Sequence, residues 1–134
     1  MANEFVMKNE NTPAKVMIIE DEKDLCFLLA CIVKKQNFFP SCVNSLTEAK
    51  QEIKKINPEI LFIDNNLPDG SGADFIGQVK EMCPRTKIIM ITAHDSPKDV
   101  QKAFTKGADY FITKPFNTFT IQSMLSRITL AHAS

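Results

Sequence analysis

The sequence lacks several features that identify common classes of protein. Its 134 residues carry 16 basic and 16 acidic side chains, so neither charge is in excess. This balance argues against a nucleic-acid-binding protein and gives no support for docking on an anionic membrane. No apolar run approaches the roughly 18 residues of a membrane-spanning helix, and the polar N-terminus has no secretory signal. We therefore expect a cytoplasmic protein that contacts neither membrane nor nucleic acid directly.

Cysteine, histidine and glycine are too few and too scattered to form familiar motifs. The two histidines are too far apart in the sequence to suggest a metal cluster, and none of the four glycines directly follows the first apolar run, which excludes a P-loop. Four cysteines lie among apolar residues without CxxC or zinc spacing, which predicts reduced core cysteines. They are Cys26, Cys31, Cys42 and Cys83.

The sequence does contain a regular alternation of short apolar runs and amphipathic segments. The runs predict strands at residues 15–19, 38–43, 59–63, 87–91 and 109–112. Helical spacing follows each run, at residues 22–36, from residue 45, around residues 75–79, from residue 96 and at 118–130. This (βα)5 order predicts a doubly wound parallel sheet with helices on both faces. We expect a flexible leader over residues 1–14 and one domain over residues 15–131.

Single residues refine this prediction. Pro40 cannot donate to a ladder, which places the second strand at an edge of the sheet. Residues 64–72 are loop by composition. Helical spacing predicts that Leu28 belongs to the apolar stripe of the first helix and that Phe104 faces inward from the fourth.

Polar residues follow four of the predicted strands at the edge where ligands bind in such sheets. Glu20, Asp21 and Glu22 follow the first strand, Asp64 the third, Thr92 the fourth and Lys114 the fifth. Acids gathered there repel one another unless a cation joins them, and Mg2+ suits oxygen ligands. The set is suited to phosphoryl transfer onto Asp64.

Each residue also has a plainer interpretation. The acids after the first strand could do no more than stabilise a helix N-terminus. Asp64 could be no more than a turn residue. Thr92 could be an ordinary strand-end residue, Lys114 a surface lysine and Phe111 a core aromatic residue.

From Lys15 to about residue 130 the sequence resembles the receiver domain of two-component response regulators. The matching residues are the acidic pair, the aspartate with a proline four residues on, the hydroxyl residue and the lysine–proline pair. They are Glu20, Asp21, Asp64, Pro68, Thr92, Lys114 and Pro115. The resemblance implies a flavodoxin-like fold with strand order 2-1-3-4-5 and a cis Lys114–Pro115 peptide.

The resemblance also assigns roles. Asp64 would be the phosphoacceptor, and Glu20, Asp21, Asp64 and the backbone carbonyl of Asn66 would bind Mg2+, with Mn2+ able to replace it. Thr92 and Lys114 would bind the phosphoryl group. Phe111 occupies a switch position that is often Tyr, and Asn66 and His94 occupy positions that tune dephosphorylation.

The expected function is a phosphorelay switch, not a turnover enzyme. A histidine kinase or a histidine phosphotransfer protein would phosphorylate Asp64. The face of the fourth helix, fifth strand and fifth helix would then bind an effector or a second copy of the domain. A phosphorylation-independent pseudo-receiver that binds partners is the alternative. An aspartyl phosphatase is disfavoured because Asn66 stands where such enzymes place a second Asp.

Overall fold

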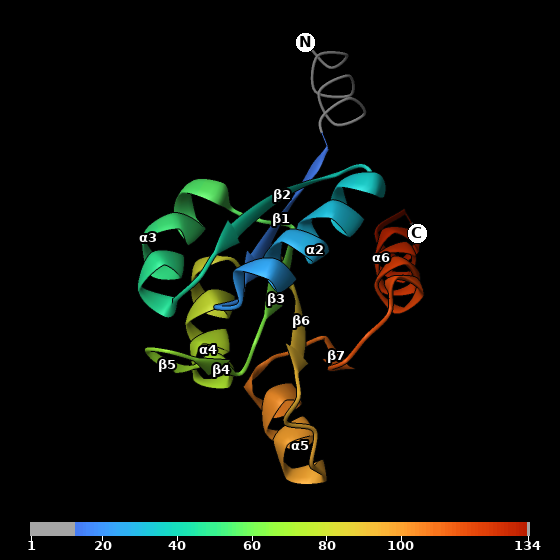
Figure 1. The fold of residues 1–134 in the computed structure, drawn as a ribbon. Coiled ribbons are helices and arrows are strands. Elements are labelled where there is room, and N and C mark those ends of the chain that lie inside the picture. Colours follow the sequence, from blue (N-terminus) through green and yellow to red (C-terminus); the bar gives the residue numbers. More distant parts are fainter. Residues whose placement is uncertain (1–12, 134) are drawn as a thin grey trace.

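A computed structural model describes residues 13–133, and five parallel strands form its central sheet (Figure 1). The strands are β1 (Ala14–Ile19), β2 (Phe38–Val43), β3 (Ile60–Ile63), β6 (Lys87–Thr92) and β7 (Tyr110–Thr113). Their order across the sheet is β2-β1-β3-β6-β7. Counting only these five strands, this is the predicted order 2-1-3-4-5. It places β2, which contains Pro40, at an edge, as predicted.

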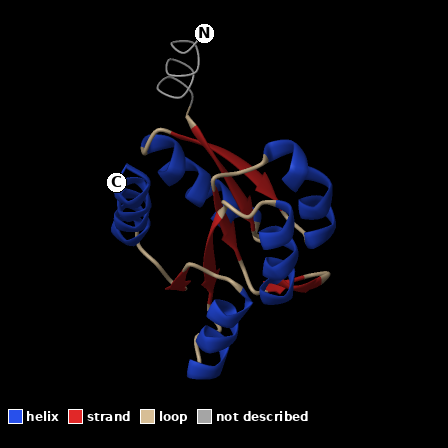
Figure 2. Ribbon diagram, turned by 180° about the vertical axis from the view of Figure 1, so that it is seen from behind, coloured by secondary structure: helices blue, strands red, loops and turns tan. Residues whose placement is uncertain are grey.

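Five helices cover the two faces of the sheet (Figure 2). They are α2 (Lys23–Lys35), α3 (Leu46–Ile56), α4 (Gly72–Met82), α5 (Pro97–Lys106) and α6 (Thr118–Ala133). The side chains of α2 and α6 form one buried cluster with one face of the sheet, and those of α3, α4 and α5 form the other. The predicted doubly wound α/β fold is confirmed.

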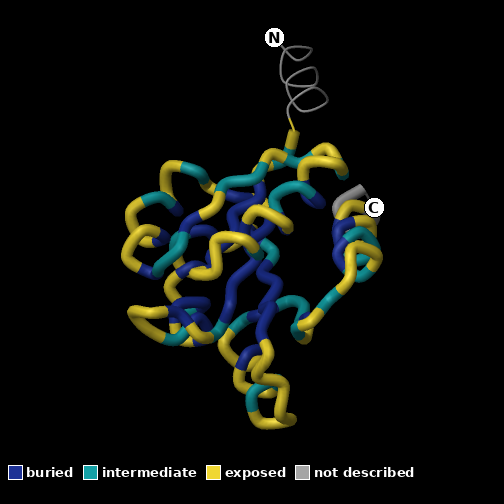
Figure 3. Tube along the Cα trace, in the orientation of Figure 1, coloured by how far each residue is buried: buried dark blue, intermediate teal, exposed yellow. Residues whose placement is uncertain are grey.

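The central strands are buried on both faces, which explains their continuous apolar runs (Figure 3). Alternate residues of β1 point to opposite layers: Val16 and Ile18 to the α2–α6 cluster, Met17 and Ile19 to the other. Every residue of β3 is buried. The sheet is therefore a rigid support for the residues that follow its strands.

Local signals define the helix ends. Ser45, Ser71 and Ser96 each cap a helix by accepting a hydrogen bond from the amide three residues on. Pro97 occupies the first turn of α5, and Gly107 ends that helix with φ of 121°, a value that favours glycine.

Three predictions about local structure, for residues 64–72, Leu28 and Phe104, were incomplete or wrong. The segment predicted as loop contains a short antiparallel hairpin, β4 (Asn66–Leu67) and β5 (Gly70–Ser71). Leu28 and Phe104 are 47% and 44% exposed. The buried face of α2 instead centres on Leu29 with Cys26, Ile32 and Val33. Of the predicted leader, residues 1–12 lie outside the described residues, and Ala14 already belongs to β1.

Of the four predicted reduced core cysteines, only Cys83 is both free and buried. Cys26 of α2 and Cys42 of β2 form a disulfide, and Cys42 is exposed because it lies on the edge strand. Cys31 and Cys83 are free thiols, and only Cys83 is fully buried. None of the helices described for residues 13–133 has the length and apolar character needed to span a membrane.

Thr86 connects the loops that precede β3 and β6, at the end of the sheet opposite the acidic residues. Its buried Oγ1 donates a 2.6 Å hydrogen bond to the carbonyl of Pro58. We expect Thr86→Val to lower the free energy of unfolding by about 1–3 kcal/mol, because the isosteric side chain leaves this buried carbonyl without its donor. Urea unfolding measures the change. Thr86→Ser, which keeps the hydroxyl, should lose less, and equal losses would contradict the argument.

Candidate functional site

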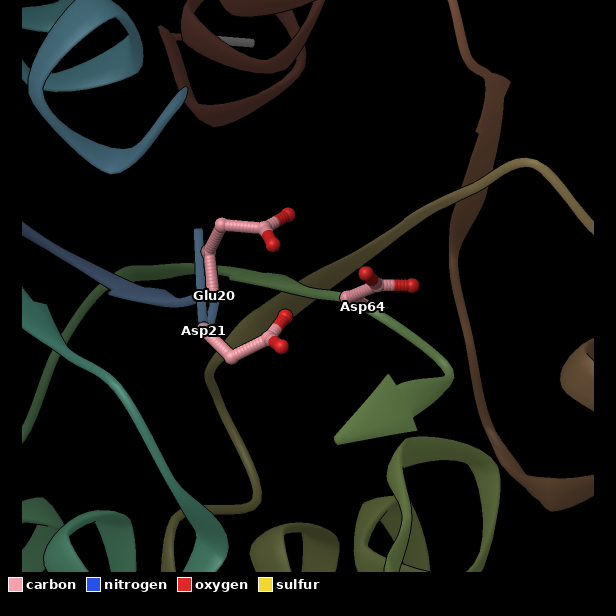
Figure 4. A group of neighbouring side chains, drawn as sticks. All are labelled: Glu20, Asp21 and Asp64. Carbon is pink, nitrogen blue, oxygen red and sulfur yellow. The ribbon is translucent and has the colours of Figure 1, made fainter. Parts of the chain in front are cut away.

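The polar residues that follow the strands meet at the carboxyl edge of the sheet. Neighbouring strands bring Glu20, Asp21 and Asp64 together: the Asp64 amide donates to the Ile19 carbonyl (3.1 Å), and the Glu20 amide to the Val43 carbonyl (3.0 Å). Figure 4 shows the side chains of Glu20 and Asp21 pointing toward the side where Asp64 lies. One carboxylate oxygen from each acid lies within 4.8 Å of the others. The structure thus places together the three acids predicted as metal ligands.

Lys114 joins the last strand of the sheet to these acids. Its Nζ lies 2.9 Å from Asp64 Oδ2, 2.8 Å from Glu20 Oε1 and 3.8 Å from Glu22 Oε1. The Lys114 amide donates to the Thr92 carbonyl (2.9 Å), and the Lys114–Pro115 peptide is cis, as the resemblance implied. The backbone after β7 thus directs the ammonium group between two buried carboxylates.

The pKa values of Glu20 and Lys114 are both raised, for different reasons. Burial raises the pKa of Glu20, helped by the charge of Asp64 and opposed by hydrogen bonds from Lys114 and the Glu22 amide. Burial acts to lower the pKa of Lys114, but its hydrogen bonds to Glu20 and Asp64 outweigh this and raise it. Lys114 therefore stays cationic at neutral pH.

The charge at this edge suits a hard divalent cation. Three ionised carboxylates and one ammonium leave two uncompensated negative charges, from −3 and +1. Glu20 is fully buried, and its Oε1 lies 2.8 Å from the Lys114 ammonium. Asp21 is exposed, which leaves the cluster open to solvent. Three carboxylates within 4.8 Å of one another, sharing one ammonium, fit a hard divalent cation such as Mg2+.

Thr92, Asn66 and His94 surround the Asp64 side of the site. Thr92 is buried, and its Oγ1 accepts a 3.3 Å hydrogen bond from the His94 amide. The Asn66 amide donates to Asp64 Oδ1 (3.2 Å), while its side-chain amide contacts the His94 ring. The two residues expected to tune dephosphorylation therefore touch each other beside Asp64. The metal-binding role of the Asn66 carbonyl stays a prediction.

Phe111 lies behind Thr92, on the neighbouring strand β7. It is half-buried and packs against the exposed Phe104 of α5, with ring centroids 6.5 Å apart. A small hollow separates it from Thr92 and is also lined by Met90 and Ala103. The predicted switch residues therefore line one common hollow.

Other residues support the site without having been predicted. Asn44 Nδ2 donates to the Glu20 carbonyl (2.8 Å), and Asn65 Oδ1 accepts from the Ala73 amide (3.0 Å). A Cβ at Gly72 would lie 2.1 Å from the Asp64 carbonyl oxygen, so only glycine fits there. The sequence could have pointed to Gly72, because it lies in a loop after Asp64 that contains two glycines. No sequence pattern points to Asn44, because 24 residues separate it from Glu20.

Residues 16–126 match the family model described as the response regulator receiver domain. The chain belongs to this family. It is 32% identical over 113 residues to the sensory transduction protein RegX3 of Mycolicibacterium smegmatis, covering 84% of this chain and 48% of that protein. It is 27% identical over 123 residues to the transcriptional regulatory protein TrcR of Mycobacterium tuberculosis, covering 92% and 47%. The chain thus spans about half the length of these relatives.

Solved receiver structures have the same fold. The beryllofluoride-activated NtrC4 receiver domain dimer matches with a TM-score of 0.80 and 31% identity, covering 84% of this chain and 93% of that one. The chemotaxis response regulator CheY4 of Vibrio cholerae matches with a TM-score of 0.81 and 25% identity, covering 87% and 99%. The chain is therefore a receiver domain of the two-component type in sequence and in fold.

Asp69 ties the loop after Asp64 to α3. Its carboxylate accepts hydrogen bonds from the Thr47 hydroxyl (2.6 Å), the Leu46 amide (2.9 Å) and the Thr47 amide (2.8 Å). These bonds lower the pKa of Asp69 from 3.8 to about 2. Because the pKa is depressed, the stabilisation is complete above the unfolded value and is lost as pH falls through the folded value.

We therefore expect Asp69→Asn to destabilise the protein at neutral pH and to matter progressively less in acid. The difference between the wild-type and variant unfolding midpoints should shrink as pH falls from 3.8 toward about 2. Thermal unfolding followed by circular dichroism measures it. Glu81→Gln, a change at an exposed acid, is the control. A difference that does not depend on pH would contradict the assignment.

Proposed function

We propose that this receiver domain is a phosphorelay switch that accepts a phosphoryl group on Asp64. A histidine kinase or a histidine phosphotransfer protein is the proposed donor. The observation that carries the proposal is the 2.9 Å contact between Asp64 Oδ2 and the Lys114 ammonium, directly beside the carboxylates of Glu20 and Asp21. An ordinary turn aspartate would not need a buried cation and two further acids.

The chemistry follows from the positions of these groups. A carboxylate oxygen of Asp64 bonds to phosphorus while the bond from phosphorus to the donor's imidazole nitrogen breaks. Lys114 neutralises negative charge on the transferred group, as it already does for Asp64. Mg2+, with Mn2+ able to replace it, would be held by Glu20, Asp21, Asp64 and the Asn66 carbonyl and would supply further positive charge.

Switching is proposed to run through Thr92 and Phe111. The Thr92 hydroxyl would turn to the phosphoryl oxygens, giving up its bond from the His94 amide. Phe111, which lines the same hollow as Thr92, would then repack against it. This would alter the face formed by α5, β7 and α6, where Phe104 and Phe119 are exposed. An effector or a second copy would bind that face.

Under this proposal the domain catalyses only its own phosphorylation and dephosphorylation. Asn66 and His94, in contact beside Asp64, would set the lifetime of the acyl phosphate. Their placement would let them order or exclude the water that hydrolyses it. The proposal assigns the chain to the cytoplasm, where phosphorylated kinase domains act.

Labelling with acetyl phosphate tests the proposed acceptor. With Mg2+ present, we expect the wild-type protein to gain one phosphoryl group by intact mass, and Asp64→Asn to gain none. Asp74→Asn, a change at an exposed acid of α4 outside the site, should still be labelled. Excess EDTA should abolish labelling of the wild type. An unmodified wild-type protein, under conditions that label another receiver, would favour the pseudo-receiver alternative.

A change at Thr92 should separate phosphorylation from switching. We expect Thr92→Ala to be labelled on Asp64, because Lys114 and the acids remain, but to lose the response of Phe111 and α5. Amide chemical shifts of residues 97–113 before and after labelling measure that response. Thr92→Ser keeps the hydroxyl and should retain it. An unchanged response in Thr92→Ala would exclude Thr92 as the sensor.

A further inference from the structure

The disulfide joins two elements that flank the acidic loop. Cys26 closes the first turn of α2 and is 2% exposed, whereas Cys42 is an exposed residue of the edge strand β2. Their Cα atoms are 6.2 Å apart, and Cys42 pairs in register with Ile18 of β1, on the side of the sheet that α2 covers. The pair crosslinks α2 directly to the edge of the sheet (Figure 1).

We propose that Cys26 and Cys42 form a reversible redox site that controls the loop carrying Glu20 and Asp21. Nothing in the phosphorelay chemistry uses these sulfur atoms. An edge strand leaves Cys42 open to small thiols and disulfides, while burial shields Cys26 until its partner has reacted. Thiol–disulfide exchange needs an accessible sulfur and a second cysteine in bonding position, and Cys42 and Cys26 supply them.

The reaction is a balanced exchange with a low-molecular-weight disulfide such as oxidised glutathione. The Cys42 thiolate attacks one sulfur of the oxidant, forms a mixed disulfide and releases one thiol. Cys26 then attacks the Cys42 sulfur and releases the second thiol. The two protein thiols lose two electrons and two protons in total, and the oxidant gains them. An excess of a small dithiol reverses both steps.

The crosslink acts on the acidic loop from both sides. The Val43 carbonyl, directly after Cys42, accepts the Glu20 amide (3.0 Å), and Asn44 donates to the Glu20 carbonyl (2.8 Å). On the other side, the Cys26 amide donates to the Glu22 carbonyl (3.0 Å). Residues 20–22 therefore lie between two segments that the disulfide fixes. Reduction frees α2 to move relative to β2 and loosens this loop.

The first experiment counts thiols in the full chain. After treatment with oxidised glutathione, denaturation and alkylation, we expect two modified cysteines, mapped by peptide mass spectrometry to Cys31 and Cys83. After treatment of the folded protein with dithiothreitol, we expect four. Cys31→Ser should still form the crosslink, and Cys42→Ser should not. Four free thiols after oxidation, another pairing, or a pair that resists reduction in the folded protein would each overturn the proposal.

The second experiment measures the effect on the loop. Oxidation should raise the thermal midpoint by roughly 10 °C, because it closes a short loop in the unfolded chain. It should also slow hydrogen exchange several-fold at the amides of residues 20–26. Cys42→Ser should match the reduced protein under both conditions, which shows that it folds. Equal exchange of residues 20–26 in the two redox states would overturn control of the loop.

The effect on phosphorylation rests on the proposed function. We expect several-fold slower labelling of Asp64 by acetyl phosphate in the reduced protein, because Glu20 and Asp21 are then less well ordered. Equal labelling rates in the two states would overturn control of the site. If Asp64 is labelled in neither state, the proposed function fails, while thiol counts and hydrogen exchange still decide whether the crosslink controls the loop.

Discussion

The ammonium group of Lys114 holds the carboxylates of Glu20 and Asp64 together at the edge of the sheet. Without it, two buried carboxylates on neighbouring strands would repel each other, and burial would favour protonation of one. The contacts of 2.8 and 2.9 Å place one ammonium against both carboxylates. They also leave the site short of positive charge. A single lysine therefore permits the acid cluster but offsets only part of its negative charge.

This interaction depends on the order of the strands. The β2-β1-β3-β6-β7 order puts β1 beside β3 and β6 beside β7. The residues after β1 and β3 can then touch, and the Lys114 backbone is fixed by Thr92 at the end of β6. Gly72 completes the arrangement, because any larger side chain would collide with the Asp64 carbonyl. The chemistry of the site is thus a direct consequence of parallel pairing and of one close backbone approach.

The sequence predicted the fold and the strand-end residues because both follow from short-range patterns. Asp64 and Lys114 are recognisable because each ends a continuous apolar run. Asn44 and Asp69 act through partners 22 to 24 residues away, and no local pattern encodes those contacts. The same holds for Cys26 and Cys42, whose apolar neighbours suggested burial. The prediction for Leu28 was wrong because helical spacing allows either Leu28 or Leu29 to face the sheet. In the structure Leu29 faces it.

The contacts that hold the site in place are more numerous on its β1 side than on its β6 side. On the β1 side, the disulfide and the contacts of Val43 and Asn44 hold the acidic loop to a fixed edge of the sheet. On the β6 side, the Thr92 hydroxyl has one 3.3 Å hydrogen bond and borders a hollow. A group bound at Asp64 would therefore move the side of Thr92 and Phe111 while the acids stay in place.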